Sequence, residues 1–123
     1  MRRSEVLALS ISVLWVAGCT DEKGDHPTFE LLSPGQTGVT FANTITTSDS
    51  VNVQTDVYVY NGAGVAVGDI DNDGLSDIFF AGNMISSRLY RNNGHMQFED
   101  ITERAGVKTS RWATGVTMVD INN

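Results

Sequence analysis

The amino-acid sequence predicts an all-β fold built from a unit of four short antiparallel strands. Three observations support this prediction. Short runs of β-forming residues alternate with turn residues along the second half of the chain. A nine-residue stretch occurs twice, and its first copy runs into a group of closely spaced aspartates. Together these features indicate a repeat protein whose strands are joined by tight, polar loops.

The composition is typical of a folded protein that does not bind nucleic acid. Of the 123 residues, 41% are hydrophobic and 19% are charged, which is compatible with a packed core. Fifteen acidic residues outweigh eight basic ones and give a formal net charge of -7. No cluster of lysine or arginine follows Arg3, so no basic surface for nucleic acid is expected.

Residues 1–18 have the features of an export signal. Arg2 and Arg3 precede an uncharged, mostly apolar run over residues 6–18. As a helix this run would span about 20 Å, which is shorter than the roughly 30 Å hydrocarbon core of a membrane. A cleaved lipoprotein signal peptide is therefore favoured over a permanent transmembrane helix.

Cys19, the only cysteine, lies directly after the apolar run. Residues 16–19, Val-Ala-Gly-Cys, resemble the bacterial lipobox, in which the bond before the cysteine is cut and the cysteine is acylated. The resemblance implies that a lipid on Cys19 anchors the protein to a membrane, as an exported outer-membrane lipoprotein on the periplasmic or cell-surface side. The alternative is an incidental cysteine within a cleaved signal.

Residues 19–38 and 39–60 precede the region of clear strand patterning. The first segment is polar, rich in turn residues and without clear periodicity, and it is interpreted as a tether. The second is an N-terminal edge segment of threonine, serine, asparagine and valine, in which one or two edge strands are expected. It ends in the β-forming run Val57–Tyr60, and the following Asn61-Gly62 pair indicates a turn.

Residues 61–107 are predicted to form the first four-stranded unit. The stretch Asn92–Gly94 is expected to be the hairpin turn between the last two strands. Residues 102–107 are expected to form a loop or a helical turn that Gly106 ends. The four predicted strands cover Val65–Val67, Ile78–Ala81, Arg88–Tyr90 and Gln97–Ile101.

An internal repeat supports this division. The nine residues from Gly64 to Asn72 align without gaps with Gly115 to Asn123, with five of nine positions identical and a period of 51 residues. A period near 50 with four strands per unit is typical of a β-propeller blade. Residues 108–123 are then the start of a second, incomplete blade. Since propellers contain about four to eight blades, we expect this chain to be an N-terminal fragment. The alternative is that two similar strand-to-turn junctions arose by chance.

The loop after the first predicted strand carries carboxylates at the spacing of a calcium-binding loop. Asp69, Asp71, Asp73 and Asp77 occupy positions 1, 3, 5 and 9, and a glycine occupies position 6. In such a loop alternate side chains turn toward a hard cation, the glycine permits the sharp turn, and the carbonyl of position 7 adds another oxygen. Oxygen-only ligands favour Ca²⁺, and the lack of histidine or cysteine in the loop argues against Zn²⁺ or copper.

The flanking residues distinguish this loop from helix-flanked calcium sites. An EF-hand requires a glutamate at position 12, where this chain has Phe80, and its flanks are helical rather than β-like. With Asp77 as its last acid, the loop fits between two strands. The alternative to a metal site is a solvated turn rich in aspartate and asparagine.

The stretch from Gly64 to Phe80 resembles the FG-GAP or VCBS repeat, the calcium-binding blade of integrin α-chain propellers and of many exported bacterial proteins. The later stretches Leu89–Asn92, Phe98–Thr102 and Ala105–Val107 are similar to bacterial relatives of cartilage acidic protein, of the ASPIC/UnbV type. The Phe-Gly and Gly-Ala-Pro sequences that give the repeat its name are absent.

The resemblance also implies roles for individual residues. It makes Asp69, Asp71, Asp73 and Asp77 side-chain ligands of Ca²⁺ and Leu75 a carbonyl ligand. Asp120 and Asn122 match positions 1 and 3 of a second, partial metal site. Because extracellular modules bind Ca²⁺ with dissociation constants on the order of 0.1–1 mM, the ion is expected to be a structural staple rather than a sensor.

The sequence contains no recognisable catalytic constellation. His26 in the tether and His95 after the hairpin turn have no acid or nucleophile at a motif spacing, and no nucleophile elbow or phosphate-binding loop occurs. We therefore expect a noncatalytic binding or scaffold module that presents its loops to a protein or glycan. The alternative is the N-terminal propeller part of a larger extracytoplasmic enzyme.

Overall fold

The computed structural model describes residues 29–121. The chain divides into two compact units, residues 1–30 and 31–123, and only Phe29 and Glu30 of the first unit are described. The proposed signal peptide, Cys19, His26 and Asn122 lie outside the described residues. Within residues 29–121 no helix has the length and apolar character needed to cross a membrane.

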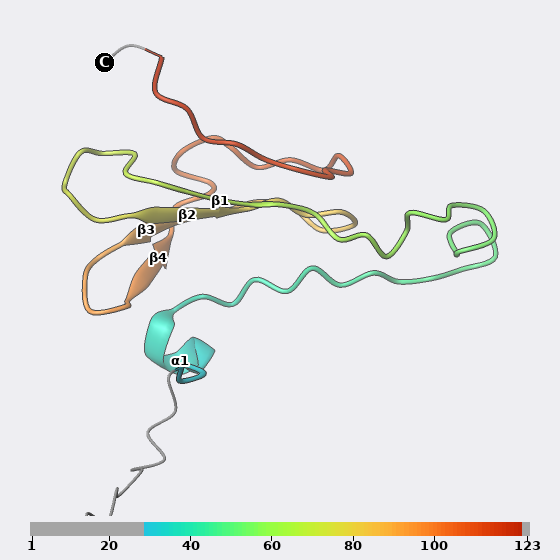
Figure 1. Cartoon of the computed structure of the whole chain (residues 1–123), viewed down its shortest axis with the longest axis horizontal. Helices are drawn as coiled ribbons and strands as arrows, with labels where there is room; N and C mark the ends of the chain where they lie inside the picture. Colours follow the sequence, from blue (N-terminus) through green and yellow to red (C-terminus); the bar gives the residue numbers. More distant parts are fainter. Residues whose placement is uncertain (1–28, 122–123) are drawn as a thin grey trace, which may run out of the picture. The chain divides into compact units, whose positions relative to one another are not determined.

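The second unit contains one open sheet of four antiparallel strands, which confirms the predicted all-β class (Figure 1). Neighbouring strands in the chain are also neighbours in the sheet, and each lies within one or two residues of its predicted position. This is the arrangement expected of a propeller blade. The strands are β1 (Val65–Gly68), β2 (Asp77–Phe80), β3 (Arg88–Asn92) and β4 (Phe98–Asp100).

Aromatic side chains join the sheet to the segment that precedes it. Phe80 of β2 stacks on Phe41 with ring centroids 5.0 Å apart and meets Tyr90 of β3 edge-on at 5.8 Å. Tyr90 is 1% exposed, and its hydroxyl accepts a hydrogen bond from the backbone N–H of Thr40 at 3.3 Å. Residues near Phe41 therefore contribute to the small core of the sheet.

A short helix, α1 (Pro34–Thr37), lies within the segment interpreted as a tether. Pro34 occupies its first turn, and the Gln36 side chain accepts a hydrogen bond from the backbone N–H of Ser33 at 2.8 Å. Proline at this position with serine before it and glutamine three residues later is a helix-start signal. Gly38 ends the helix with φ of 77° and lies against the backbone of Phe98 in β4. The last residues of the predicted tether thus form a short helix and contact the sheet.

The edge strands expected within residues 39–60 do not form. This range contains only an isolated bridge between Ser48 and Val51, and residues 57–60 form turns. The Asn52 side chain accepts the backbone N–H groups of Gln54 and Thr55, and the Asp56 side chain accepts that of Tyr58. Such local hydrogen bonds compete with strand pairing, so turns prevail over the β propensity of valine and tyrosine.

The buried amide of Asn83 connects three distant parts of the second unit. Its Nδ2 donates to the carbonyl oxygen of Gly62 at 3.0 Å and to that of Ala113 at 2.8 Å. Its Oδ1 accepts from the side chain of Asn43, whose own Oδ1 accepts the backbone N–H of Asn83. Asn83 is 3% exposed, so a fully satisfied amide holds the loop between β2 and β3 to the preceding and following segments.

The turns after β3 and β4 follow the predicted pattern with one difference. The β3–β4 turn is closed by hydrogen bonds from Asn93 N to Gln97 O and from Gln97 N to Gly94 O. It is therefore longer than the predicted Asn92–Gly94 turn. After β4, Ala105 N donates to Ile101 O at 2.8 Å, and Gly106 has φ of 67°. This is the helical turn that Gly106 was expected to end.

The second copy of the repeated stretch passes alongside β1 without pairing with it as a strand. A Cβ atom added to Gly64 would lie 2.7 Å from the backbone nitrogen of Val116, and one added to Gly68 would lie 3.0 Å from Sδ of Met118. Residues 115–121 have no strand assignment. The two copies thus contact one another at Gly64 and Gly68 of the first copy.

Candidate metal site

The aspartate-rich loop occupies residues 69–76, between the end of β1 and the start of β2. It reverses direction through two residues with left-handed backbones, Asn72 at φ of 58° and Gly74 at φ of 85°. Asparagine and glycine are the residues that adopt this conformation at the lowest cost. The sequence therefore forms a compact turn between the two strands.

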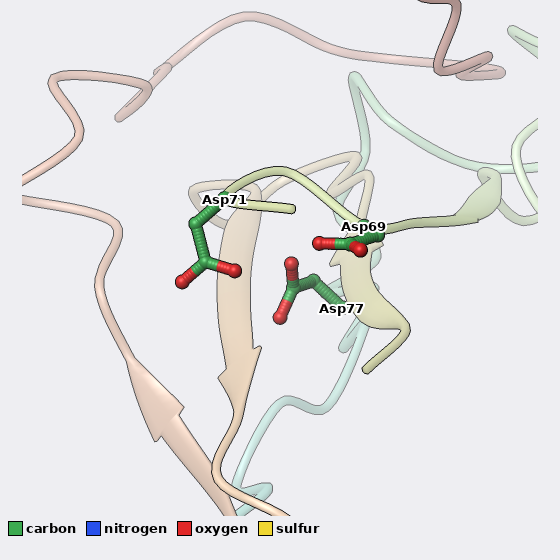
Figure 2. A group of neighbouring side chains, drawn as sticks. All are labelled: Asp69, Asp71 and Asp77. Atoms are coloured by element: carbon green, nitrogen blue, oxygen red, sulfur yellow. The ribbon is translucent and has the colours of Figure 1, made fainter. Parts of the chain in front are cut away.

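The carboxylates of Asp69, Asp71 and Asp77 converge on one space beneath the loop (Figure 2). One oxygen from each lies within 4.8 Å of the others. A Ca²⁺ ion binds oxygen at about 2.3–2.6 Å, so oxygens up to roughly 5 Å apart can share one ion. The donor set is also composed only of hard oxygen ligands, as Ca²⁺ prefers. The residues present therefore fit this cation.

Asp77 is the fixed member of the cluster. It is 0% exposed, its Oδ2 accepts the backbone N–H of Ile70 at 2.9 Å, and its Oδ1 accepts that of Asn92 at 2.8 Å. A buried carboxylate requires such partners to offset the loss of water. Asp77 thus joins the first residues of the loop, the start of β2 and the end of β3.

Asp69 organises the loop around its own carboxylate. Its Oδ1 accepts the backbone N–H of Asp73 at 3.2 Å, and its Oδ2 accepts that of Gly74 at 2.9 Å. These bonds fold the loop toward the first aspartate. Each carboxylate oxygen still has lone pairs available for a cation.

Asp73, another predicted ligand, is outside the group of converging acids and makes a local hydrogen bond. Oδ1 of Asp73 accepts the backbone N–H of Leu75 at 2.8 Å, which is the hydrogen bond of an Asx turn. Among the described residues, the convergent group of acids contains Asp69, Asp71 and Asp77. Coordination by the Asp73 side chain and the Leu75 carbonyl remains a prediction.

The proposed second site is described only at Asp120. This residue lines a groove with Asp69, Gly68 and Met118, which lies between the metal loop and the second copy of the repeated stretch. Corresponding first aspartates of the two copies thus border the same groove. The role of Asp120 as a ligand remains a prediction, together with that of Asn122.

Two residues of β3 support the loop, and the sequence predicted no contact of either residue with it. Asn92 donates from Nδ2 to the carbonyl of Ser76 at 3.0 Å, in addition to the bond from its backbone to Asp77. Arg91 places Nη1 3.9 Å from Oδ2 of Asp71. The Leu89–Asn92 stretch was recognised by resemblance, but strand pairing alone brings it to the loop.

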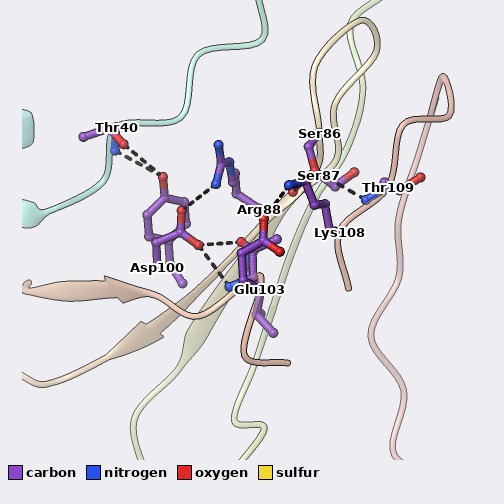
Figure 3. A network of polar contacts seen from close by, with 11 residues as sticks. Thr40, Ser86, Ser87, Arg88, Asp100, Glu103, Lys108 and Thr109 are labelled. Atoms are coloured by element: carbon purple, nitrogen blue, oxygen red, sulfur yellow. Dashed lines mark hydrogen bonds and ion pairs between the residues drawn. The ribbon is translucent and has the colours of Figure 1, made fainter. Parts of the chain in front are cut away.

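A second polar network links β3, β4 and the following turn (Figure 3). Oδ2 of Asp100 lies 3.0 Å from Nη1 of Arg88, and Oδ1 accepts the hydroxyl and backbone N–H of Thr102. Burial acts to raise the pKa of Asp100, but the hydrogen bonds from Thr102 and the nearby Arg88 outweigh it and hold this pKa below its usual range. Asp100 is therefore stabilised in its charged form.

The histidine of the described region has the surface position expected from the sequence. His95 is exposed in the β3–β4 turn, where its backbone has φ of 53°.

Two ion pairs lie in exposed positions: Lys108 pairs with Glu103, and Arg104 pairs with Glu99. Exposed ion pairs of this kind contribute little to stability, so the metal loop is the feature with the clearest chemistry.

Comparison with known families agrees with this structure. Residues 69–123 match the model of a family described as FG-GAP-like repeat. The match begins at the first aspartate of the loop and includes β2, β3, β4 and the second copy of the repeated stretch. It supports the prediction of a repeat protein. Comparisons with curated proteins and with solved structures give no match.

Proposed function

We propose that this chain is a calcium-binding repeat module of an exported, lipid-anchored protein, with a noncatalytic binding or scaffold role toward a protein or glycan. The observation that carries the proposal is the convergence of Asp69, Asp71 and Asp77 in a loop between two strands. The FG-GAP-like match of the same loop and the following strands supports it.

A bound Ca²⁺ ion would act as a structural staple at one end of the sheet. Asp69 follows β1 and Asp77 begins β2, so one ion held by both links the two strand ends. The bond from Asn92 to Asp77 extends this link to β3. Without a cation the three carboxylates repel one another, and a divalent ion removes that repulsion. Binding is therefore expected to favour the folded state.

Thermal unfolding of the full chain in a Ca²⁺ titration tests the proposal. A ligand that binds only the folded state at ten times its dissociation constant adds about 1.4 kcal/mol to the free energy of unfolding. For a chain of this size that raises Tm by several degrees. Ca²⁺ up to about 10 mM covers the affinity range of extracellular modules, and a chelator should reverse the shift.

Mg²⁺ is the matched control for this titration. It requires near-ideal octahedral geometry and releases its water reluctantly, so an equal concentration should produce a smaller rise in Tm. If Ca²⁺ produces no rise over the whole range, the structural role of the ion is wrong.

The lipid anchor has an independent test. When the full chain is expressed in a Gram-negative bacterium with labelled palmitate, the wild type should incorporate label and sediment with the outer membrane. The Cys19→Ala variant should do neither, because acylation requires the thiol of the only cysteine. Equal labelling of the two proteins would rule out Cys19 as the modified residue.

We also propose that the repeat belongs to the ASPIC/UnbV type of bacterial protein. The similarity of Leu89–Asn92, Phe98–Thr102 and Ala105–Val107 to that group supports this finer assignment. The corresponding role is presentation of loops outside the cytoplasm. Retention of the full chain on immobilised surface proteins or glycans, measured with Ca²⁺ and with a chelator, would show whether ligand binding depends on the metal loop.

A further inference from the structure

Arg91 of β3 places a fixed positive charge beside the metal loop. Its Nη1 lies 3.9 Å from Oδ2 of Asp71, and its Nη2 lies 3.3 Å from Oε2 of Glu99. Arg91 and Glu99 are direct partners in the register of β3 and β4. One guanidinium group therefore lies between a carboxylate of the loop and a carboxylate of the sheet.

The guanidinium group is incompletely hydrogen-bonded in this position. Nη2 donates to Glu99 and to Oδ1 of Asn93 at 3.1 Å, but Nε is buried and has no hydrogen-bond partner among the described residues. The contact with Asp71 is the longer of the two ion pairs, and both Asp71 and Arg91 have side chains that are 37% exposed. The guanidinium group therefore already lacks one of its possible hydrogen bonds. A small shift of this group between the two carboxylates does not disrupt a fully bonded arrangement.

Asp71 is attracted both by Arg91 and by any cation that binds among the three aspartates. Pairing with Arg91 lowers the negative charge that Asp71 offers to a cation, and the guanidinium group repels a divalent ion bound nearby. Both effects weaken binding of Ca²⁺. The Glu99 carboxylate reduces both effects, because it holds the guanidinium group on the sheet and away from Asp71.

We infer that Arg91 competes with Ca²⁺ for Asp71 and thereby lowers the affinity of the loop, and that Glu99 limits this competition by holding Arg91 on the sheet. This inference rests on the proposed calcium-binding function. Arg91 and Glu99 then adjust the affinity of the site and couple the metal loop to the β3–β4 edge of the sheet.

Calorimetric titration of the full chain with CaCl₂ at an ionic strength of about 0.15 M, where the Debye length is about 8 Å, tests the inference. Arg91→Gln should raise the affinity by about two- to fivefold, the range expected for loss of one exposed ion pair. Glu99→Gln should lower the affinity, because Arg91 then pairs with Asp71 alone. The double variant should bind as Arg91→Gln does, since Glu99 has no guanidinium group left to hold.

Matched controls remove the same charges elsewhere. Arg88→Gln deletes an arginine of the same strand that pairs with Asp100, and Glu103→Gln deletes an acid that pairs with Lys108. Each control should leave the affinity within about twofold of the wild type, because a charge paired away from the loop is largely screened. Circular dichroism before the titration verifies that each variant is folded.

The outcomes separate the inference from the proposed function. If the wild type binds no Ca²⁺, the proposed function fails. If the wild type binds Ca²⁺ and Arg91→Gln binds no more tightly than Arg88→Gln, the proposed function stands and the competition is wrong. Should Arg91→Gln fail to fold, the other pair decides: a loss of affinity in Glu99→Gln beyond that in Glu103→Gln supports the competition, and equal affinities overturn it.

Discussion

The three aspartates of the candidate metal site differ in burial and in hydrogen bonding. Asp77 is fully buried and accepts two backbone N–H groups, so the fold depends on it with or without a cation. Asp69 accepts two N–H groups of its own loop. The Asp71 carboxylate is more than a third exposed and faces Arg91. We therefore expect substitutions at Asp77 and Asp71 to separate stability from metal binding.

Asp77→Asn should destabilise the chain even without Ca²⁺. The new amide N–H group would face a backbone N–H group, and the resulting unsatisfied donors cost about 1–3 kcal/mol. Asp71→Asn should leave calcium-free stability nearly unchanged and remove most of the Ca²⁺-dependent gain. Urea unfolding with and without Ca²⁺ measures both quantities. A full Ca²⁺-dependent gain in Asp71→Asn would contradict the assignment of Asp71 as a ligand.

The lowered pKa of Asp100 should make the free energy of unfolding depend on pH in the acid range. Its pKa in the folded state is held below its usual range, with burial opposed by the bonds from Thr102 and by Arg88. A lowered pKa stabilises the fold fully above the unfolded value of about 3.9, and this contribution is lost as pH falls through the folded value. Urea unfolding between pH 5 and pH 2, conditions chosen to bracket this range, should show a smaller loss of stability for Asp100→Asn than for wild type. An equal loss would mean that other carboxyl groups carry the effect.

At the scale of elements, the contact between β1 and the second copy of the repeated stretch depends on glycine. Gly64 precedes β1 and lies against Gly115 and Val116. Gly64 and Gly115 occupy the same position in the two copies, but a Cβ atom on Gly115 would meet nothing within 4 Å. The contact therefore requires the absence of a side chain at this repeat position in the first copy only.

Gly64→Ala should destabilise the chain by about 1–3 kcal/mol, the usual cost of inserting a methyl group where no space exists. Gly115→Ala should have a much smaller effect, because its added methyl group lies in open space. The difference in urea midpoint between the two variants measures the cost of the contact. Equal midpoints would mean that the second copy does not pack on β1 in solution.

The elements that sequence reasoning located are those with local signals. The strands follow β-forming runs, and Asn72, Gly74 and Gly106 take the turn conformations that their residue types permit. Val57–Tyr60 has the same β propensity but forms turns, because local hydrogen bonds prevail there over strand pairing. The start of α1 also has a local signal, in Ser33 and Gln36.

At the scale of the whole molecule, the pattern of strand and turn residues predicted the class of the fold. The spacing of the aspartates predicted a loop with four acidic ligands, and three of these acids, Asp69, Asp71 and Asp77, lie together in the structure. Contacts between distant residues were not predictable from spacing. Arg91 reaches Asp71 only through the pairing of β3 with β2. Thr40 contacts Tyr90, about fifty positions later in the chain, and Phe41 contacts Phe80, about forty positions later.

The amide of Asn83 has a consequence for the order in which the chain acquires its structure during synthesis. Its partners lie 40 residues earlier at Asn43, 21 residues earlier at Gly62 and 30 residues later at Ala113. The last of these leaves the ribosome after all four strands, so one N–H group of the amide bonds to water until translation has passed the sheet. Residues that follow β4 therefore complete the hydrogen bonding of the loop between β2 and β3.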